Sequence, residues 1–295
     1  MLERIEKNAI KHFIYLSRLG GYSVYRSGIL TIVNCGLGSP LFNIVCDTHL
    51  EEWARAKQDK ALFEDVSEGL GVARSRAEFL GMVSDANTRY GEDLIKEKIR
   101  EVIDAFKGQS FSWWLGPSCD PFWLPYLLSE MGFEDSTNEY AMALDLSEYR
   151  SDSKILSEQL TIRIEQLKTV EQLEHFIQIK EIGESSARQF YEQLKPWMLN
   201  EQEMMFVGYL GNIPVVTGAL YHQEDTTGIY SLYTDPSQRG HTFGTQMVHH
   251  LVRASKTTSS RHVTLLTSLD SGYQLFEQIG FKSYGGFKCM KWGRG

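Results

Sequence analysis

One order of secondary-structure elements recurs in the two halves of this chain. In each half the residue pattern predicts an amphipathic helix, a buried strand, a second helix that ends at Gly-Phe, and a further strand. The predicted ranges are 92–106, 111–115 and 121–131 in the first half, and 244–256, 263–267 and 272–279 in the second. Gly132 precedes Met142 by ten residues, and Gly280 precedes Met290 by the same interval. The equal spacing favours an internal duplication over the chance recurrence of a common order.

The duplication predicts two domains within the 295 residues. The last predicted strand of each half covers 140–146 and 287–292, and the polar run after Leu146 is the best linker candidate. We therefore expect an N-terminal domain over 1–148, a linker over 149–159 and a C-terminal domain over 160–295. Helices and hairpins alternate in both domains, which predicts an α/β class with mixed sheets.

Local patterns predict most of the remaining elements. Apolar residues at helical spacing predict a helix over 2–19, and Gly36 to Ser39 read as a hairpin connection between two strands. Thr169 and Gln172 have the spacing of a capping box that opens a helix. The Gly211-Asn212 turn predicts a hairpin of strands 204–210 and 213–221. The run before helix 92–106 is polar, and no close-spaced glycine loop precedes that helix.

The corresponding position in the second half has a different character. A predicted strand over 228–234 leads into a loop over 235–245 that contains arginine and glycine, and a helix follows. The first-turn N–H groups of a helix lack partners inside the helix, and its dipole favours an anion there. This arrangement is how proteins hold phosphate groups, although an ordinary strand-to-helix turn has the same outline.

Charge and cysteine usage exclude several classes of function. Residues 1–150 carry 16 Lys and Arg against 23 Asp and Glu, and residues 151–295 carry 14 against 15, so neither half offers the basic surface that nucleic acid requires. The sequence has no apolar run of membrane-spanning length and no signal-peptide pattern at Met1. Four scattered cysteines lack metal-binding spacing, which favours a reducing cytoplasm and no metal.

Residues 160–292 resemble the GNAT superfamily of acyl-CoA-dependent acyltransferases. Two motifs carry the resemblance: Arg239-Gly240-His241-Thr242-Phe243-Gly244 after a strand, and Leu275-Phe276-Glu277-Gln278-Ile279-Gly280-Phe281 in the last helix. The N-terminal half resembles the degenerate domain of tandem GNAT proteins through Phe111 to Pro117 and Gly132-Phe133. The resemblance implies an acyl-CoA N-acyltransferase fold in two tandem copies.

The resemblance also implies a coenzyme A site in the second copy alone. The pyrophosphate would bind the backbone N–H groups of the loop, the pantetheine arm would pair with strand 228–234, and a nearby N–H would polarise the thioester carbonyl. The implied cofactor residues are Leu232, Tyr233, Thr234, Arg239, Gly240, His241, Thr242, Phe243, Gly244, Thr245, Ser268 and Phe276.

Two positions depart from the family pattern. Thr242 replaces the middle glycine of the loop motif, and its Cβ limits how closely a ligand approaches. Phe276 stands where the family often has a tyrosine that protonates the leaving thiolate, so Tyr273 on the same helix is our candidate acid, with a core aromatic as the alternative. Strand 228–234 contains no carboxylate to act as a base, which leaves His222, Glu224 and Asp225 nearby.

We therefore expect an N-acetyltransferase that uses acetyl-CoA to acetylate an amine of a small molecule or peptide. Two alternatives remain at this point: a non-catalytic acyl-CoA-binding module, and transfer of an aminoacyl or longer acyl group. The N-terminal domain has three candidate uses, as a scaffold, as a wall of the substrate site, or as the surface of a homodimer. Neither nucleic acid nor a membrane is expected as a partner.

Overall fold

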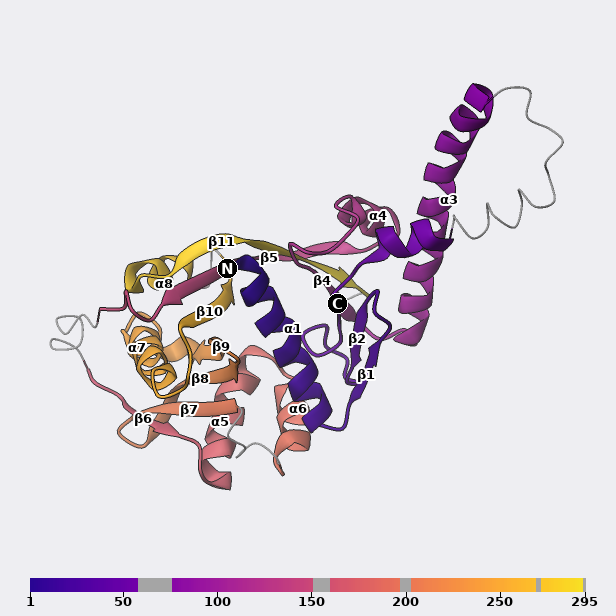
Figure 1. Cartoon of the computed structure of the whole chain (residues 1–295). Helices are drawn as coiled ribbons and strands as arrows, with labels where there is room; N and C mark the ends of the chain where they lie inside the picture. Colours follow the sequence, from indigo (N-terminus) through magenta and orange to yellow (C-terminus); the bar gives the residue numbers. More distant parts are fainter. Residues whose placement is uncertain (58–75, 151–159, 197–202, 269–271, 294–295) are drawn as a thin grey trace.

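A computed structural model gives the fold for residues 1–57, 76–150, 160–196, 203–268 and 272–293, with the backbone alone over 76–90. Its strands form one 11-stranded mixed sheet in the order β1-β2-β3-β4-β11-β5-β10-β9-β8-β7-β6 (Figure 1). The strands are β1 (Ser23–Arg26), β2 (Thr31–Asn34), β3 (Ile44–Cys46), β4 (Phe111–Leu115), β5 (Glu134–Asp145), β6 (Arg163–Gln166), β7 (Glu203–Leu210), β8 (Ile213–Gln223), β9 (Thr226–Thr234), β10 (His262–Thr267) and β11 (Lys282–Trp292). The helices are α1 (Leu2–Leu19), α3 (Arg76–Ala105), α4 (Leu124–Glu130), α5 (Val170–Gly183), α6 (Ala187–Leu194), α7 (Phe243–Ser255) and α8 (Tyr273–Ile279).

The duplication predicted from the sequence is present, and the two copies exchange strands at the centre of the sheet. Strand β4 is parallel to β3, and β10 is parallel to β9, at equivalent places in the two copies. The last strand of each copy then pairs with the other copy: β11 with β4, and β5 with β10. Strands β5 and β11 are also antiparallel to each other, with Phe287 opposite Glu139. The two halves therefore share one continuous sheet.

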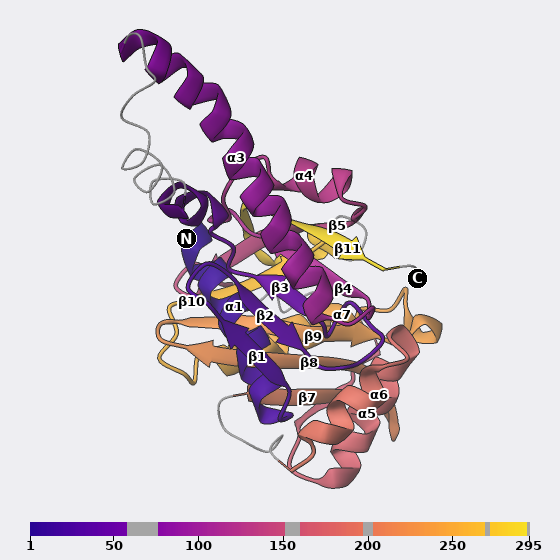
Figure 2. The ribbon, with the colours of Figure 1, turned by 90° about the vertical axis from the view of Figure 1, so that its right-hand side faces the viewer.

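Helices cover both faces of this sheet. Helix α7 packs on β8 and β9, where Met247 and Leu251 lie beside Gly218. Its buried residues share one core cluster with Met142 and Leu144 of β5, so the C-terminal core lies on one face. Helices α3 and α4 cover the N-terminal part of that face around Trp113. The alternating residues of β5 point to the opposite face, which carries α1, α5 and α6 (Figure 2). Helix α1 belongs to the N-terminal half and lies across strands of both halves.

Several predicted elements have different limits in the structure. Helix α3 begins at Arg76 rather than near residue 92, because Gly91 lowers helix stability by only about 1 kcal/mol and does not end the helix. Strands β5 and β11 begin six and five residues before their predicted starts at Tyr140 and Phe287. The early part of β5 is acidic, and Lys288 of β11 forms an ion pair with Asp135 at 2.9 Å. The capping box at Thr169 is confirmed, with Gln172 N–H donating to the Thr169 side chain at 3.2 Å.

The structure also describes the cysteines, the possible metal-binding side chains and the apolar character of the helices. All four cysteines are free thiols, and burial raises the pKa of Cys119 and of Cys289 to about 11. In the described ranges, three or more metal-binding side chains nowhere converge on one point. The described helices also include none that combines the length and the apolar character needed to cross a bilayer. Most of the expected linker, residues 151–159, lies outside the described ranges.

Candidate active site

Strands β9 and β10 separate in the middle of the sheet. They pair in parallel at three positions only, the last of which joins Thr264 to Gly228. Beyond that position β9 contains a bulge, because Ser231 and Leu232 stand against one residue of β8. Ser231 has a φ of 52°, which is uncommon for a residue with a side chain. The bulge re-aims the backbone of β9 at the point where the two strands diverge.

A cavity of about 290 Å³ occupies this split, and we call it the β9–β10 cavity. Elements of both halves of the chain enclose it, from α1, β4 and β5 in the first half to α5 and α8 in the second. Its lining residues are Phe13, Trp114, Glu139, Lys180, Ile229, Tyr230, Ser231, Leu232, Leu265, Leu266, Thr267 and Phe276. The edges of β9 and β10 therefore form the sides of the cavity, and residues from both halves of the chain surround it.

The loop that follows β9 presents open backbone at the start of α7. The Asp235 side chain accepts the Ser237 N–H at 2.8 Å and fixes the turn. Gly240 has a φ of 85°, and a Cβ placed on it would contact nothing. A Cβ at Gly244 would meet only the Thr234 hydroxyl, at 3.4 Å. Thr242, at the N-cap of α7, forms no side-chain cap, so the first-turn N–H groups stay available to a ligand.

The predicted cofactor residues lie in β9, in the loop and first turn of α7, just after β10, and in α8, and they contact different neighbours. Leu232 and Phe276 line the cavity, and Phe276 is buried. The Tyr233 ring is flanked by two cations, with Arg239 at 5.4 Å and Lys180 at 5.6 Å from its centroid. Ser268 follows the end of β10, and the His241 ring stacks on buried Phe243 at 5.1 Å. Thr245 lies one residue beyond Gly244 in the first turn of α7.

Tyr273 has a different position from Phe276. Its ring packs edge-to-face on Tyr140 with centroids 5.0 Å apart, and it is absent from the residues that line the β9–β10 cavity. Phe276, one turn later on α8, faces that cavity. The role of Tyr273 as an acid stays a prediction.

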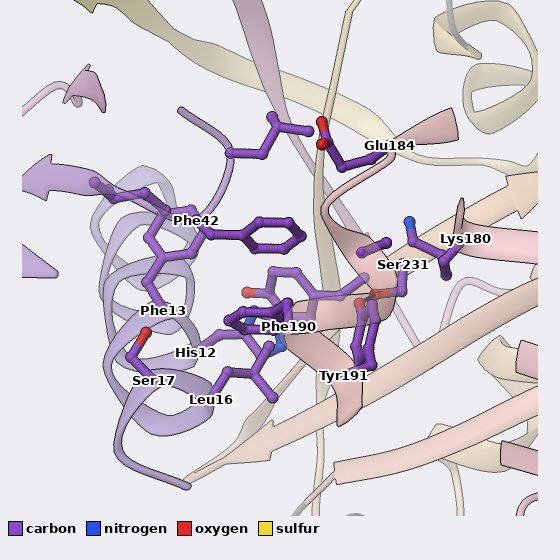
Figure 3. Close-up of a pocket in the computed structure, with 14 residues that line it drawn as sticks. His12, Phe13, Leu16, Ser17, Phe42, Lys180, Glu184, Phe190, Tyr191 and Ser231 are labelled. Carbon is purple, nitrogen blue, oxygen red and sulfur yellow. Dashed lines mark hydrogen bonds between the residues drawn. The ribbon is translucent and has the colours of Figure 1, made fainter. Parts of the chain in front are cut away.

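A second cavity of about 190 Å³ adjoins the first, and we call it the α1–α6 cavity. The two share Phe13, Lys180, Tyr230 and Ser231. Figure 3 shows α1 side chains on one side, Lys180, Ser231 and Tyr191 on the other, and the Phe42 ring pointing between them. The complete lining is His12, Phe13, Leu16, Ser17, Leu41, Phe42, Ile44, Lys180, Glu184, Ala187, Phe190, Tyr191, Tyr230 and Ser231.

Two ionisable groups in these cavities have shifted pKa values. Burial lowers the pKa of Lys180 to about 8, against the opposing effect of Glu184 one turn away. Burial also raises the pKa of the Glu139 carboxyl above its ordinary value, partly offset by a hydrogen bond from Thr137. A base and an acid with pKa values moved toward neutrality are common at catalytic sites.

The expected bases near the β8–β9 turn lie elsewhere. Glu224 forms an ion pair with Lys7 at 3.0 Å, and Asp225 forms one with Arg4 at 2.7 Å. His222 hydrogen-bonds to Ser260 at 2.9 Å. The two ion pairs hold the start of α1 against the β8–β9 turn, and none of the three residues lines either cavity.

Residues 167–281 match the profile of the acetyltransferase (GNAT) family, and the match spans α5 to α8, including the split and the loop. This part of the chain is a GNAT acetyltransferase domain. GNAT proteins are acyltransferases, so acyl transfer is the general activity of this class. No curated protein sequence is significantly similar to the chain.

Solved structures show the same fold over both halves of this GNAT protein. A GCN5-related N-acetyltransferase from Kribbella flavida superposes with a TM-score of 0.65 at 13% identity, over 100% of this chain and 96% of the other. A GCN5-related N-acetyltransferase from Sphaerobacter thermophilus gives 0.54 at 12% identity, over 90% and 76%. A functionally unknown conserved protein from Staphylococcus epidermidis gives 0.54 at 10%, over 92% and 93%. At these identities the likeness concerns the fold.

The sequence did not single out the residues that the N-terminal half brings to the GNAT site. Glu139 stands in β5, and Phe13 and Phe42 stand in α1 and in the loop before β3. Lys180 is the one lysine of the helix that Thr169 opens, and no motif in the sequence marks it. One sequence pattern could have indicated Glu139 as a site residue, because its carboxylate stands immediately before the apolar run Tyr140 to Leu144.

Proposed function

We propose that this GNAT protein is an N-acetyltransferase that moves the acetyl group of acetyl-CoA to an amine of a small molecule or peptide by direct attack. The split between β9 and β10, with its bulge at Ser231, is the observation that carries the proposal. The family match over 167–281 and the open loop before α7 support it.

The loop has the features that a pyrophosphate requires. Its glycines keep the approach clear, since a Cβ at Gly240 would meet nothing and one at Gly244 only Thr234. The uncapped N–H groups of Phe243, Gly244 and Thr245 would bind the phosphate oxygens with the help of the α7 dipole. Exposed Arg239 would add a charge-assisted contact. Leu232 to Thr234 lie between this loop and the bulge, where an extended pantetheine arm would pair with the β9 backbone.

The bulge and the cavity supply the chemical groups. When bound, acetyl-CoA supplies the activated thioester carbonyl. A backbone N–H at the Ser231 bulge would stabilise the negative charge that develops on its oxygen. The neutral amine forms the bond to the acetyl carbon while the C–S bond breaks, and Glu139 accepts the amine proton. Tyr273 donates a proton to the departing thiolate in this proposal.

Titration calorimetry with acetyl-CoA tests the binding half of the proposal. The wild-type chain should bind, and Gly244→Val should weaken binding strongly because the new side chain enters the loop. Valine is not less favourable than glycine in a helix, so the fold should survive. Gly38→Val is the control, because a Cβ there meets nothing and Gly38 lies in the N-terminal half. An absence of binding at millimolar acetyl-CoA would refute the proposal.

Release of free CoA in the presence of amines tests the catalytic half. Removing a general base typically lowers turnover by about 10²–10⁴-fold, so Glu139→Gln should reduce kcat on that scale with acetyl-CoA binding retained. The raised pKa of Glu139 means that the carboxyl loses its role as it is protonated, so wild-type activity should fall toward acidic pH. Glu134→Gln on the exposed end of β5 is the control. Binding without CoA release from any amine would favour a non-catalytic acyl-CoA-binding module instead.

A further inference from the structure

The α1–α6 cavity has walls suited to an apolar group of limited size. Its volume of about 190 Å³ is below the ~300–1,000 Å³ of pockets for drug-sized ligands. The rings of Phe42 and Phe190 stack with centroids 4.2 Å apart, and Phe13 and Leu16 of α1 complete the wall. A single aromatic ring or a branched aliphatic chain matches this space, whereas a folded peptide segment does not.

The charges around the cavity exclude a polycationic acceptor. Glu184 is the one carboxylate among the described residues that line the α1–α6 cavity, and its Oε1 already accepts the Ser186 N–H at 3.0 Å. Acceptors with several ammonium groups need several carboxylates. The apolar wall would instead desolvate each additional cation at a considerable cost.

Lys180 stands where the two cavities meet, one turn before Glu184, whose carboxylate offsets only part of the effect of burial. Lys180 lines both cavities together with Ser231. Its Nζ lies 5.6 Å from the centre of the Tyr233 ring, and it forms no ion pair within the described part of the chain. A mostly buried cation without a carboxylate in direct ion-pair contact is costly, and a ligand anion would relieve that cost. Burial accordingly lowers the pKa of Lys180 to about 8.

The apolar cavity, the Lys180 ammonium and the Ser231 bulge match the three substituents on the α-carbon of an amino acid. An apolar chamber, a cation and the Ser231 bulge meet at one place. A hydrophobic α-amino acid carries a side chain, a carboxylate and an amine on its α-carbon, at separations of a few ångströms. We propose that the acceptor is a hydrophobic α-amino acid, with its side chain in the α1–α6 cavity, its carboxylate on Lys180 and its amine toward Ser231. This inference rests on the proposed function, because the amine is the group that would be acetylated.

Three small probes separate the contributions of these groups. L-phenylalanine has all three substituents, 2-phenylethylamine lacks the carboxylate, and glycine lacks the side chain. With saturating acetyl-CoA, kcat/KM should be highest for L-phenylalanine. A hydrogen bond to a charged group contributes enough to change kcat/KM by about 10- to 100-fold, so 2-phenylethylamine should be poorer by that factor.

Variants of Lys180 and Phe42 test the assignment of each group. Lys180→Met should lower kcat/KM for L-phenylalanine by about 10- to 100-fold and leave 2-phenylethylamine unchanged. Lys180→Arg keeps the charge and should retain the preference for the carboxylate. Phe42→Ala should reduce the reaction of L-phenylalanine more than that of glycine. Lys256→Met is the matched control, because Lys256 also lies over a tyrosine ring, at 5.0 Å from Tyr149, but is exposed and remote.

The outcomes distinguish this inference from the proposed function. Equal or better reaction of 2-phenylethylamine, or an equal loss for both substrates in Lys180→Met, would overturn the inference. CoA release with other amines, but neither binding nor reaction of L-phenylalanine, would overturn it while leaving the transferase standing. The proposed transferase activity could fail while the amino-acid site is correct, and calorimetry with L-phenylalanine alone tests this case. Binding of L-phenylalanine that is lost in Lys180→Met would support the amino-acid site even without transferase activity.

Discussion

Replacing Lys180 with methionine should make the protein more stable. The side chain is held in a mostly apolar cavity, and burial lowers its pKa from the ordinary 10.5 to about 8. Each unit of pKa corresponds to about 1.4 kcal/mol, so the charged form weakens the folded state by roughly 3 kcal/mol. A cation in the last turn of a helix contributes about 0.3–1 kcal/mol in the other direction. The net gain expected for Lys180→Met at pH 7 is therefore roughly 2–3 kcal/mol in the free energy of unfolding.

The pH dependence of this gain identifies its cause. The folded-state pKa lies below the unfolded one, so at pH 7 both states hold the proton and the full penalty is present. As pH rises above 8 the folded protein releases the proton first, and the wild type gains stability relative to the variant. The difference should fall to roughly 1–2 kcal/mol at pH 9.5.

Urea unfolding at pH 7 and at pH 9.5 measures this difference. Exposed Lys256→Met should change stability little at either pH. A Lys180→Met protein that is less stable than the wild type at pH 7, or a difference that does not change with pH, would refute the reasoning.

Three further substitutions examine the rest of the molecule. Phe276→Tyr places a hydroxyl on a ring that lines the β9–β10 cavity, and because Tyr273 already supplies the proton in our proposal, we expect kcat, measured by CoA release, to change little; a rise of ~10-fold or more would show that the protein lacks the acid. Tyr273→Phe should lower kcat with unchanged affinity for acetyl-CoA, and an unchanged kcat would reject Tyr273 as the acid. Thr169→Ala removes the capping box of α5 and should cost about 1 kcal/mol of stability in urea unfolding, without effect on acetyl-CoA binding; a loss of binding would show that α5 is coupled to the loop.

Local patterns in the sequence were sufficient to predict most elements. The capping box at Thr169, the hairpin at Gly211 and the strand–loop–helix around Gly240 each depend on residues close together in the chain. The internal repeat was readable for the same reason. The general activity class then followed from two short motifs in the right order, and the family match agrees with it.

Contacts between distant segments were not predictable in this way. Glu139 and Phe13 reach the site only because the two halves share a sheet, and periodicity says nothing about which strands become neighbours. The first residues of β5 are polar and exposed, so they lack the alternation that indicates a strand. Lys180 differs from other lysines only in what packs around it. The individual site residues therefore remain proposals, and the substitutions above test them.

The exchange of β5 and β11 has a consequence for synthesis on the ribosome. Strand β5 ends at Asp145, and its two neighbours β10 and β11 begin only at His262 and Lys282. At ~5–20 residues per second, translation from β5 to β11 takes on the order of 10 s. During that time an unpaired β5 could template association with other nascent chains.

The composition of β5 counters this hazard. Glu134, Asp135 and Glu139 give its first half a negative charge that repels other copies of the same strand. Its final partner β11 carries lysines, and the contact of Lys288 with Asp135 shows how the two strands match in charge. The acidic start of β5 lacks the alternation that indicates a strand. The same charges would limit association between growing chains until β11 has been made.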